Sequence, residues 1–273
     1  MSDAASLDRI YQHGHHASVV AHHAKRTAEV EAAFFLPFLK PGMRLLDIGC
    51  GPGSITTGLA QRVAPGETIG IDPSSRVTDT AAALANGFSA GRLTFAVGDI
   101  YASPFADETF DAVFAHQVLQ HLPRPIEALQ KARMLLRPGG VIGVRDVDWG
   151  STTFYPDNPG MRRFLTLYYD LARRSGAEPN AGRHLRHWFR EAGFGETRVT
   201  TSTVSYTDSI ATAEWGDTYA ERTLRSNIAD RALELGIATR SELDQIAAAW
   251  RAWGRDPDAY FCFSHAEVVA WKR

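Results

Sequence analysis

Short apolar runs alternate with amphipathic stretches along most of the chain. Apolar or alternating runs of about four to eight residues indicate strands, whereas apolar residues three and four apart indicate helices. The pattern predicts strands at 44–48, 68–71, 93–97, a fourth run ending at 115, 141–147, 196–206 and 260–271. It predicts helices at 21–36, 55–63, 75–85, 125–136, 161–174 and 181–192, with two or three more in 209–253. Such alternation is typical of an α/β fold.

Composition narrows the class of protein. The chain has 273 residues, of which 44% are apolar and 22% charged, and a formal net charge of −2. This balance favours neither nucleic acid nor an anionic membrane as a partner. The apolar runs fall short of the ~20 residues that a membrane span requires, and no secretory signal is visible. Cys50 and Cys262 form neither a CxxC motif nor a disulfide framework. We therefore expect a cytoplasmic enzyme.

Histidines gather near the N-terminus, in Tyr11–His16 and at His22 and His23. Neighbouring histidines in a helix point to different faces, and no set of cysteine or acidic ligands accompanies them. We expect solvated or lid-forming histidines here and no metal site.

A glycine-dense turn, Asp47-Ile-Gly-Cys-Gly-Pro-Gly-Ser54, follows the first strand. Glycine allows a ligand to approach the backbone closely, and the next helix presents unpaired N–H groups and the positive end of its dipole. We therefore expect a nucleotide-like ligand, and the carboxylate of Asp47 suits a cationic group on it. Ser54 stands where the dinucleotide fingerprint has its third glycine, which together with Asp47 argues against a nicotinamide oxidoreductase.

Acidic residues also follow the second and third predicted strands. Asp72 comes about 20 residues after the glycines, where it can accept the ribose hydroxyls of any nucleoside. Asp99 fits an adenine amino group and Ile100 fits the adenine face, although Asp99 can equally be a turn or helix-capping residue. The candidate contacts at these two strand ends are Asp72, Pro73, Ser74, Gly98, Asp99 and Ile100.

These motifs together resemble class I S-adenosylmethionine-dependent methyltransferases. The likeness runs from about residue 30 to 147. It includes the D-x-G-x-G-x-G turn, the acidic residues after the next two strands, the Pro104–Ala115 run, which is similar to the family's LPF-D-FD pattern, and the Leu136-Arg-Pro-Gly-Gly140 turn. Within class I, the chain looks most similar to methyltransferases of the ubiquinone/menaquinone-biosynthesis type.

The resemblance implies a Rossmann-like, doubly wound sheet of seven strands, the last one antiparallel. It implies a helical lid at 1–40, a cofactor-binding core at 41–150, and the rest of the sheet with substrate-cap helices at 151–273, all within one catalytic domain. The implied cofactor is S-adenosyl-L-methionine, whose product is S-adenosyl-L-homocysteine. In this family the turn holds the amino-acid part of the cofactor, which implies contacts from Asp47, Gly49, Cys50, Gly51 and Gly53.

Related enzymes also fold an N-terminal helix over the cofactor, in the region where Tyr11 and Arg26 lie. Arg26 could pair with the cofactor carboxylate through its planar fork, or it could be a surface arginine. His116 and Gln117 follow the fourth strand, and we expect them to touch the ribose or the methionine part.

Methyl transfer from a sulfonium is an in-line displacement, which requires positioning, exclusion of water and in some cases a base. His121 and Asp148 are candidate bases. Imidazole titrates near neutrality, but His121 can also cap a helix or pack in the wall. Candidate linings for the substrate are Trp149, Phe154, Tyr155, Trp215 and Tyr219, each of which can equally belong to the core of the cap.

The leading expectation is methyl transfer to a small, natural-product-like molecule that is aromatic or apolar. Quinone-ring C-methylation and cofactor binding without methyl transfer are the alternatives. Arsenite methylation is disfavoured because the chain has only two cysteines. Methylation of nucleic acid is disfavoured because His116-Gln-Val-Leu replaces an N/D-P-P-Y/F run and no basic stripe is present. A homodimer is compatible with the sequence.

Overall fold

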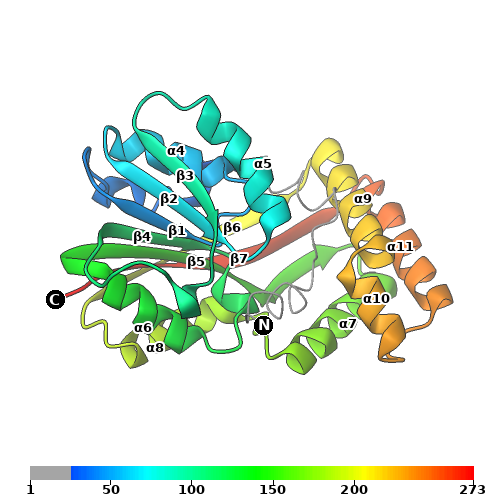
Figure 1. Ribbon diagram of the computed structural model, residues 1–273. Coiled ribbons are helices and arrows are strands. Elements are labelled where there is room, and N and C mark those ends of the chain that lie inside the picture. Colours follow the sequence, from blue (N-terminus) through cyan, green and yellow to red (C-terminus); the bar gives the residue numbers. More distant parts are fainter. Residues whose placement is uncertain (1–25) are drawn as a thin grey trace.

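A seven-stranded sheet runs through the molecule (Figure 1). The computed structural model describes residues 26–273. The strands are β1 Leu45–Ile48, β2 Glu67–Asp72, β3 Arg92–Val97, β4 Phe110–His116, β5 Leu136–Tyr155, β6 Thr197–Tyr206 and β7 Tyr260–Trp271. Their order is β3-β2-β1-β4-β5-β7-β6, and β7 alone among these strands runs in the direction opposite to the other six. The expected doubly wound sheet with an antiparallel last strand is confirmed.

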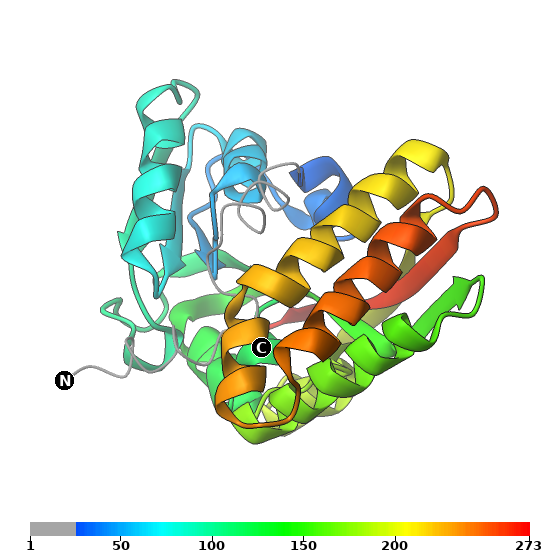
Figure 2. The same ribbon diagram turned by 90° about the vertical axis from the view of Figure 1, so that its right-hand side faces the viewer.

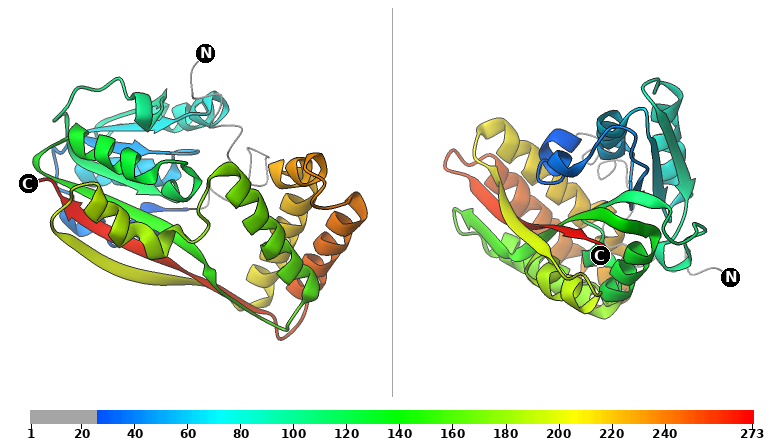
Figure 3. Two further views of the ribbon diagram at one scale, coloured as in Figure 1. Left: turned by 90° about the horizontal axis from the view of Figure 1, so that it is seen from below. Right: turned by 90° about the vertical axis from the view of Figure 1, so that its left-hand side faces the viewer.

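Helices cover both faces of the core part of the sheet (Figure 3). Their bounds are α3 Ala28–Glu31, η1 Leu36–Phe38, α4 Ser54–Val63, α5 Ser75–Asn86, η2 Ile100–Ala102, η3 Leu119–His121, α6 Pro125–Leu135 and α8 Ala181–Glu191. One face packs against α3, η1 and α4 through residues such as Phe35 and Leu59. The other packs against α6 and α8 through residues such as Leu129 and Phe189. Near-continuous apolar runs in the central strands β1 and β4 thus place buried side chains on both faces of the sheet.

Four further helices form a cap at one end of the sheet, where α7, α9 and α11 lie side by side (Figure 2). They are α7 Pro159–Ser175, α9 Ser209–Arg225, α10 Asn227–Glu234 and α11 Arg240–Gly254. Their apolar faces enclose a separate cluster with the outer parts of β5 and β7, built around Trp250, Phe164 and Phe261. As expected, α9 to α11 are inserted between the last two strands. No helix in residues 26–273 combines the length and apolar character that crossing a membrane requires.

The fifth strand is longer than the expected 141–147. β5 continues to Tyr155 because its outer half pairs with the start of β7, where Thr153 lies opposite Cys262 after an irregularity that begins at Asp148. It also takes in the glycine turn near its start, where the Gly139 N–H donates to the Lys272 carbonyl at 2.7 Å. The boundary expected at residue 150 falls within this strand, and the division into segments stays a prediction.

The helix expected at 21–36 is much shorter in the part of the chain that the structure describes. Helix α3 ends at Glu31, and the Ala32 backbone has left the helical region with φ −117°. Phe35 then packs on the sheet, where its ring stacks on Phe114 with the centroids 5.5 Å apart. Anchoring this aromatic side chain on the sheet takes precedence over continuing the helical pattern.

Candidate functional site

A cavity of about 390 Å³ opens at the carboxyl ends of β1, β2 and β4 and extends to the cap. Its walls combine the glycine turn and the acidic strand ends with aromatic side chains of β5, β6, β7 and α9. Ligands of open α/β sheets bind at this edge, outside the carboxyl ends of the strands. The cavity is therefore the candidate active site.

Two buried carboxylates stand at the ends of neighbouring strands on the core side of the cavity. Asp47 is the last but one residue of β1, and Thr56 Oγ1 donates to its Oδ2 at 2.6 Å. Asp72 ends β2 and accepts the N–H groups of Gly51 and Ser74 at 3.2 and 3.0 Å. These bonds fix the orientation of both carboxylates. Burial, opposed by the hydrogen bond from Thr56 and aided by the charge of the neighbouring Asp72, raises the pKa of Asp47 to about 7.

A third carboxylate, Asp99, lies after β3, and only one of its two oxygens accepts a hydrogen bond from the described residues. Oδ1 accepts the Tyr101 N–H at 2.9 Å and caps η2, so the turn-residue alternative is correct for this atom. Oδ2 is buried and has no hydrogen-bond partner among residues 26–273. A buried acceptor without a donor is costly. The orphaned oxygen therefore fits the adenine amino group expected here.

The glycine turn lies against the cavity in the conformation that its sequence demands. Gly49 has φ +69°, and a Cβ there would stand 2.5 Å from Val118 Cγ2. Gly51 has φ +53°, and a Cβ there would meet no atom within 4 Å, so its surroundings leave space for a ligand. The turn thus presents bare backbone to the cavity. Together with the three carboxylates, it fits a nucleoside cofactor that carries a positive charge.

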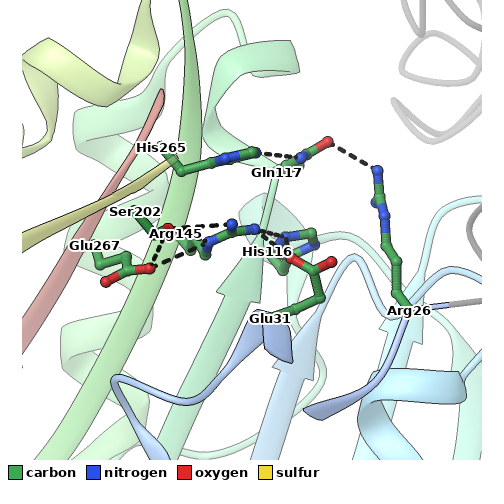
Figure 4. A network of polar contacts seen from close by, with 8 residues as sticks. All are labelled: Arg26, Glu31, His116, Gln117, Arg145, Ser202, His265 and Glu267. Carbon is green, nitrogen blue, oxygen red and sulfur yellow. Dashed lines mark hydrogen bonds and ion pairs between the residues drawn. The ribbon is translucent and has the colours of Figure 1, made fainter. Parts of the chain in front are cut away.

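A chain of hydrogen bonds crosses the cavity from Arg26 to Gln117 and His265 (Figure 4). Arg26 Nη2 donates to Gln117 Oε1 at 3.2 Å, so the amide NH₂ of Gln117 faces His265 Nε2 at 2.7 Å. That nitrogen must accept, and the proton of the neutral ring then lies on Nδ1. Burial, and next the charge of Arg145, lower the pKa of His265 to about 2, which keeps the ring neutral.

A second network lies behind the first and centres on Arg145 (Figure 4). The guanidinium of this buried residue pairs with Glu31 and with Glu267, the latter at 3.3 Å, and contacts His116 Nε2 at 2.9 Å. Ser202 Oγ completes the shell by donating to Glu267 at 2.6 Å. Burial alone would raise the pKa of Glu31, but His116, Arg145 and Arg26 lower it to about 2. The network joins the segment around α3 to the sheet.

Aromatic side chains form the cap side of the cavity. The Tyr206 and Trp215 rings stack with their centroids 4.0 Å apart, and Trp149 stacks on Phe263 at 5.2 Å. Tyr219 packs against Trp215 with the centroids 4.6 Å apart. All five residues line the cavity and belong to the apolar cluster of the cap. Trp149, Trp215 and Tyr219 therefore belong to the core of the cap and also line the cavity, and their contact with a substrate stays a prediction.

Most residues expected from the sequence do meet at this cavity. The expected residues that line it are Arg26, Asp47, Gly49, Cys50, Gly51, Asp72, Pro73, Gly98, Asp99, Ile100, His116, Gln117, His121, Trp149, Trp215 and Tyr219. Gly53 lies outside the lining and packs beside Phe95. Ser74 also lies outside, where its N–H orients Asp72. Tyr11 falls outside the described residues.

The expectation that Asp148 is a base is wrong. Val147 and Trp149 line the cavity, and because side chains alternate along a strand, Asp148 points to the opposite face of β5. There it pairs with Arg183 of α8 through two hydrogen bonds of 2.6 Å. His121 does line the cavity, but burial, and next the charge of Arg26, lower its pKa to about 3.

Phe154 and Tyr155 do not line the cavity, contrary to expectation. Phe154 packs against the cap cluster and stacks on Phe261 with the centroids 6.3 Å apart. Tyr155 is 60% exposed at the far end of β5. The continuation of the strand past Asp148 carries both residues away from the cofactor side.

Several polar cavity residues were missed from the sequence. They are Glu31, Gln120, Tyr206, Arg222 and His265. For two of them, the spacing in the sequence indicates their position. His265 follows Phe263 by two residues, which places both on one face of a strand. Arg222 follows Trp215 at a spacing of seven residues, which places both on one face of a helix.

Residues 39–193 match a known family described as a methyltransferase domain. Probable methyltransferase ltbC of Aspergillus luteorubrus is 33% identical over 96% of this chain and 97% of its own. Demethylmenaquinone methyltransferase of Lactobacillus johnsonii is 28% identical over 55% of this chain and 61% of its own.

Phosphoethanolamine N-methyltransferase 2 of Haemonchus contortus, solved with S-adenosyl-L-methionine, has a similar structure. Its TM-score is 0.60 at 19% identity, and the match covers 100% of this chain and 60% of that one. At this identity the likeness concerns the fold. The family match spans more than half of this chain, and the Aspergillus relative matches almost all of it. The chain therefore belongs to the methyltransferase domain family and is an S-adenosylmethionine-dependent methyltransferase.

Proposed function

We propose that the protein methylates a small aromatic or apolar molecule held between the strand ends and the cap. One observation carries this proposal: a single cavity joins three acidic strand ends to a wall of stacked aromatic rings. The acidic side suits the cofactor, and the aromatic side offers flat apolar surface to an acceptor.

Each part of the core side has a role in this proposal. Asp72 would hold the ribose hydroxyls, the free oxygen of Asp99 the adenine amino group, and Asp47 the positive charge. The glycine turn would admit the amino-acid part of the ligand. When bound, S-adenosylmethionine supplies a methyl group that its positive sulfonium has already activated.

The remaining residues would position the acceptor and exclude water, which are the main contributions required of the protein. The aromatic wall excludes water, and His265 offers a hydrogen-bond donor because its proton lies on Nδ1. His121 stays a candidate for accepting a proton from the acceptor. Its low pKa makes it neutral near pH 7 but a weak base, so positioning would carry more of the catalysis than proton removal.

Methyl transfer from radiolabelled cofactor to a panel of phenols, amines, aromatic acids and quinols would test the proposal. We expect transfer to at least one aromatic acceptor, and we expect Trp215→Ala to raise KM for that acceptor with little change in cofactor affinity. Tight cofactor binding without transfer to any member would instead favour a binding protein. Transfer to small aliphatic amines alone would contradict the aromatic site.

Quinone-ring C-methylation is a second candidate. The relative from Lactobacillus johnsonii is named for methylation of demethylmenaquinone, and the stacked rings of the cap suit a quinol ring. Demethylated quinols in the same panel separate the two candidates, because ring methylation yields a product that resists demethylation by acid whereas O-methylation yields an ether.

The affinity for the cofactor should depend on pH through Asp47. The pKa of this carboxyl is raised to about 7 in the free protein, and a cationic ligand binds its ionised form. Affinity for S-adenosylmethionine should therefore rise about tenfold between about pH 5.5 and 7 as Asp47 loses its proton. Calorimetry at several pH values measures this rise, and Asp47→Asn should abolish it. An unchanged pH profile in that variant would show that another group is responsible.

A further inference from the structure

Arg222 is a buried arginine in the aromatic wall of the cavity. Only 4% of the residue is exposed, and it lies on α9 one turn after Tyr219, with both side chains lining the cavity. Its guanidinium lies over the Tyr219 ring, with Cζ 5.0 Å from the centroid. Nη1 donates to Tyr219 Oη at 3.3 Å. The neighbouring ring thus holds one edge of the guanidinium in place.

The other edge has no partner in the part of the chain that the structure describes. Nε and Nη2 of Arg222 are buried and have no hydrogen-bond partner among residues 26–273. No acidic side chain in that part of the chain forms an ion pair with Arg222. An arginine keeps its charge, and a buried charge without a partner is strongly unfavourable. Such a group calls for an anionic ligand.

Another arginine of the same molecule, Arg183, shows what this edge of a guanidinium binds. In Arg183 the corresponding atoms, Nε and Nη2, each donate to one oxygen of Asp148 at 2.6 Å. Two parallel N–H groups on one edge of the planar guanidinium match the two oxygens of a carboxylate. Arg222 presents this edge in a cavity, beside rings that suit an aromatic ligand.

We propose that Arg222 binds a carboxylate on the methyl acceptor, which makes the acceptor an aromatic acid. This inference rests on the proposed function and narrows its substrate class. The acidic residues Asp47, Asp72 and Asp99 lie on the core side of the cavity, whereas Arg222 lies in the cap. The positive charge of the cofactor would lie near the acidic residues on the core side, and the negative charge of the acceptor would lie on Arg222 in the cap.

Benzoate and benzamide test the charge requirement, because they differ only in the group that Arg222 would bind. Calorimetric titration into the cofactor-free chain and into its complex with S-adenosylhomocysteine should show binding of benzoate at millimolar concentration. Benzamide should bind at least about tenfold more weakly. Arg222→Met should weaken benzoate binding by about 10- to 100-fold and leave benzamide unchanged. Arg222→Lys keeps the charge but loses the paired N–H groups, and should fall between the two.

Arg183→Met is the matched control, since it removes an arginine whose edge is already occupied by Asp148. It should leave benzoate binding unchanged. Absence of benzoate binding to the wild type, or equal binding to Arg222→Met, would overturn the proposal. So would a loss of S-adenosylhomocysteine affinity in Arg222→Met, because the arginine would then serve the cofactor.

Thermal unfolding gives an independent readout. Arg222→Met removes an unpaired buried charge, so its melting temperature should equal or exceed that of the wild type. A fall as large as that of a variant in the Arg145 network would show that Arg222 has a structural role and would contradict the proposal. Titration of S-adenosylhomocysteine alone tests the cofactor half of the proposed function, so failure there is distinguishable from failure at Arg222.

Discussion

Asp72→Ala is expected to weaken S-adenosylmethionine binding by about 10- to 100-fold. The carboxylate ends β2 at the cavity, and the N–H groups of Gly51 and Ser74 hold it in place. Its removal would delete charge-assisted hydrogen bonds to the ribose, each worth about 1.5–3 kcal/mol. Calorimetric titration of the cofactor into both proteins measures the effect.

Two comparisons make the Asp72 experiment specific. Asp79→Ala removes an exposed carboxylate from α5 and should leave the affinity unchanged. Asp72→Asn keeps the size of the side chain but removes the charge, so it should retain part of the affinity. Circular dichroism must show that each variant is folded. Equal affinities for wild type and Asp72→Ala would refute the placement of the ribose.

Arg145→Met is expected to lower the free energy of unfolding by about 3–5 kcal/mol, which corresponds to a fall of about 10 °C in melting temperature. Arg145 is only 2% exposed and pairs with both Glu31 and Glu267. Removing the guanidinium leaves two carboxylates in a buried site without their cation. Thermal and denaturant unfolding followed by circular dichroism measure the loss.

The ion pair between the half-exposed Arg183 and Asp148 provides the control for Arg145. Arg183→Met should cost about 1 kcal/mol or less. Combining Arg145→Met with Glu267→Gln should restore part of the lost stability, because the second change removes one of the carboxylates left without a cation.

The stability of the folded protein should also depend on pH through Glu31. The pKa of this carboxyl is lowered from 4.5 to about 2 in the folded state, so its ionised form adds stability above about pH 4.5, and this stability is lost as the pH falls toward 2. The difference in free energy of unfolding between wild type and Arg145→Met should therefore become smaller as the pH falls over that range. A constant difference would show that Glu31 does not contribute to the loss of stability in Arg145→Met.

The part of the cavity formed by the glycine turn and the acidic strand ends could be predicted because its signals are local. Asp47 and Asp72 lie within the last two residues of β1 and β2, Asp99 comes two residues after β3, and parallel strands bring their carboxyl ends to one edge of the sheet. The glycines near Asp47 indicate the backbone geometry of the turn directly, because glycine readily adopts positive φ and no distant contact is needed to explain it. These positions follow from the order of strands and turns alone.

The aromatic cap side of the cavity could be predicted only in part, because it depends on contacts between distant segments. The sequence predicted a fifth strand that ends at residue 147, but pairing with β7 continues β5 past this point, and Asp148 lies on the face of the strand away from the cavity. His265 and Arg222 reach the cavity from segments more than 100 residues after the glycine turn. The spacing of these residues indicates a strand and a helix, but the sequence alone does not show that these elements lie over the cavity.

The most direct test is a crystal structure of the protein with S-adenosylhomocysteine. We predict that the ribose contacts Asp72, that the adenine amino group meets the free oxygen of Asp99, and that the thioether sulfur faces the wall formed by Trp149 and Trp215. A ligand bound elsewhere, or a sulfur that faces away from the aromatic wall, would refute the proposed site.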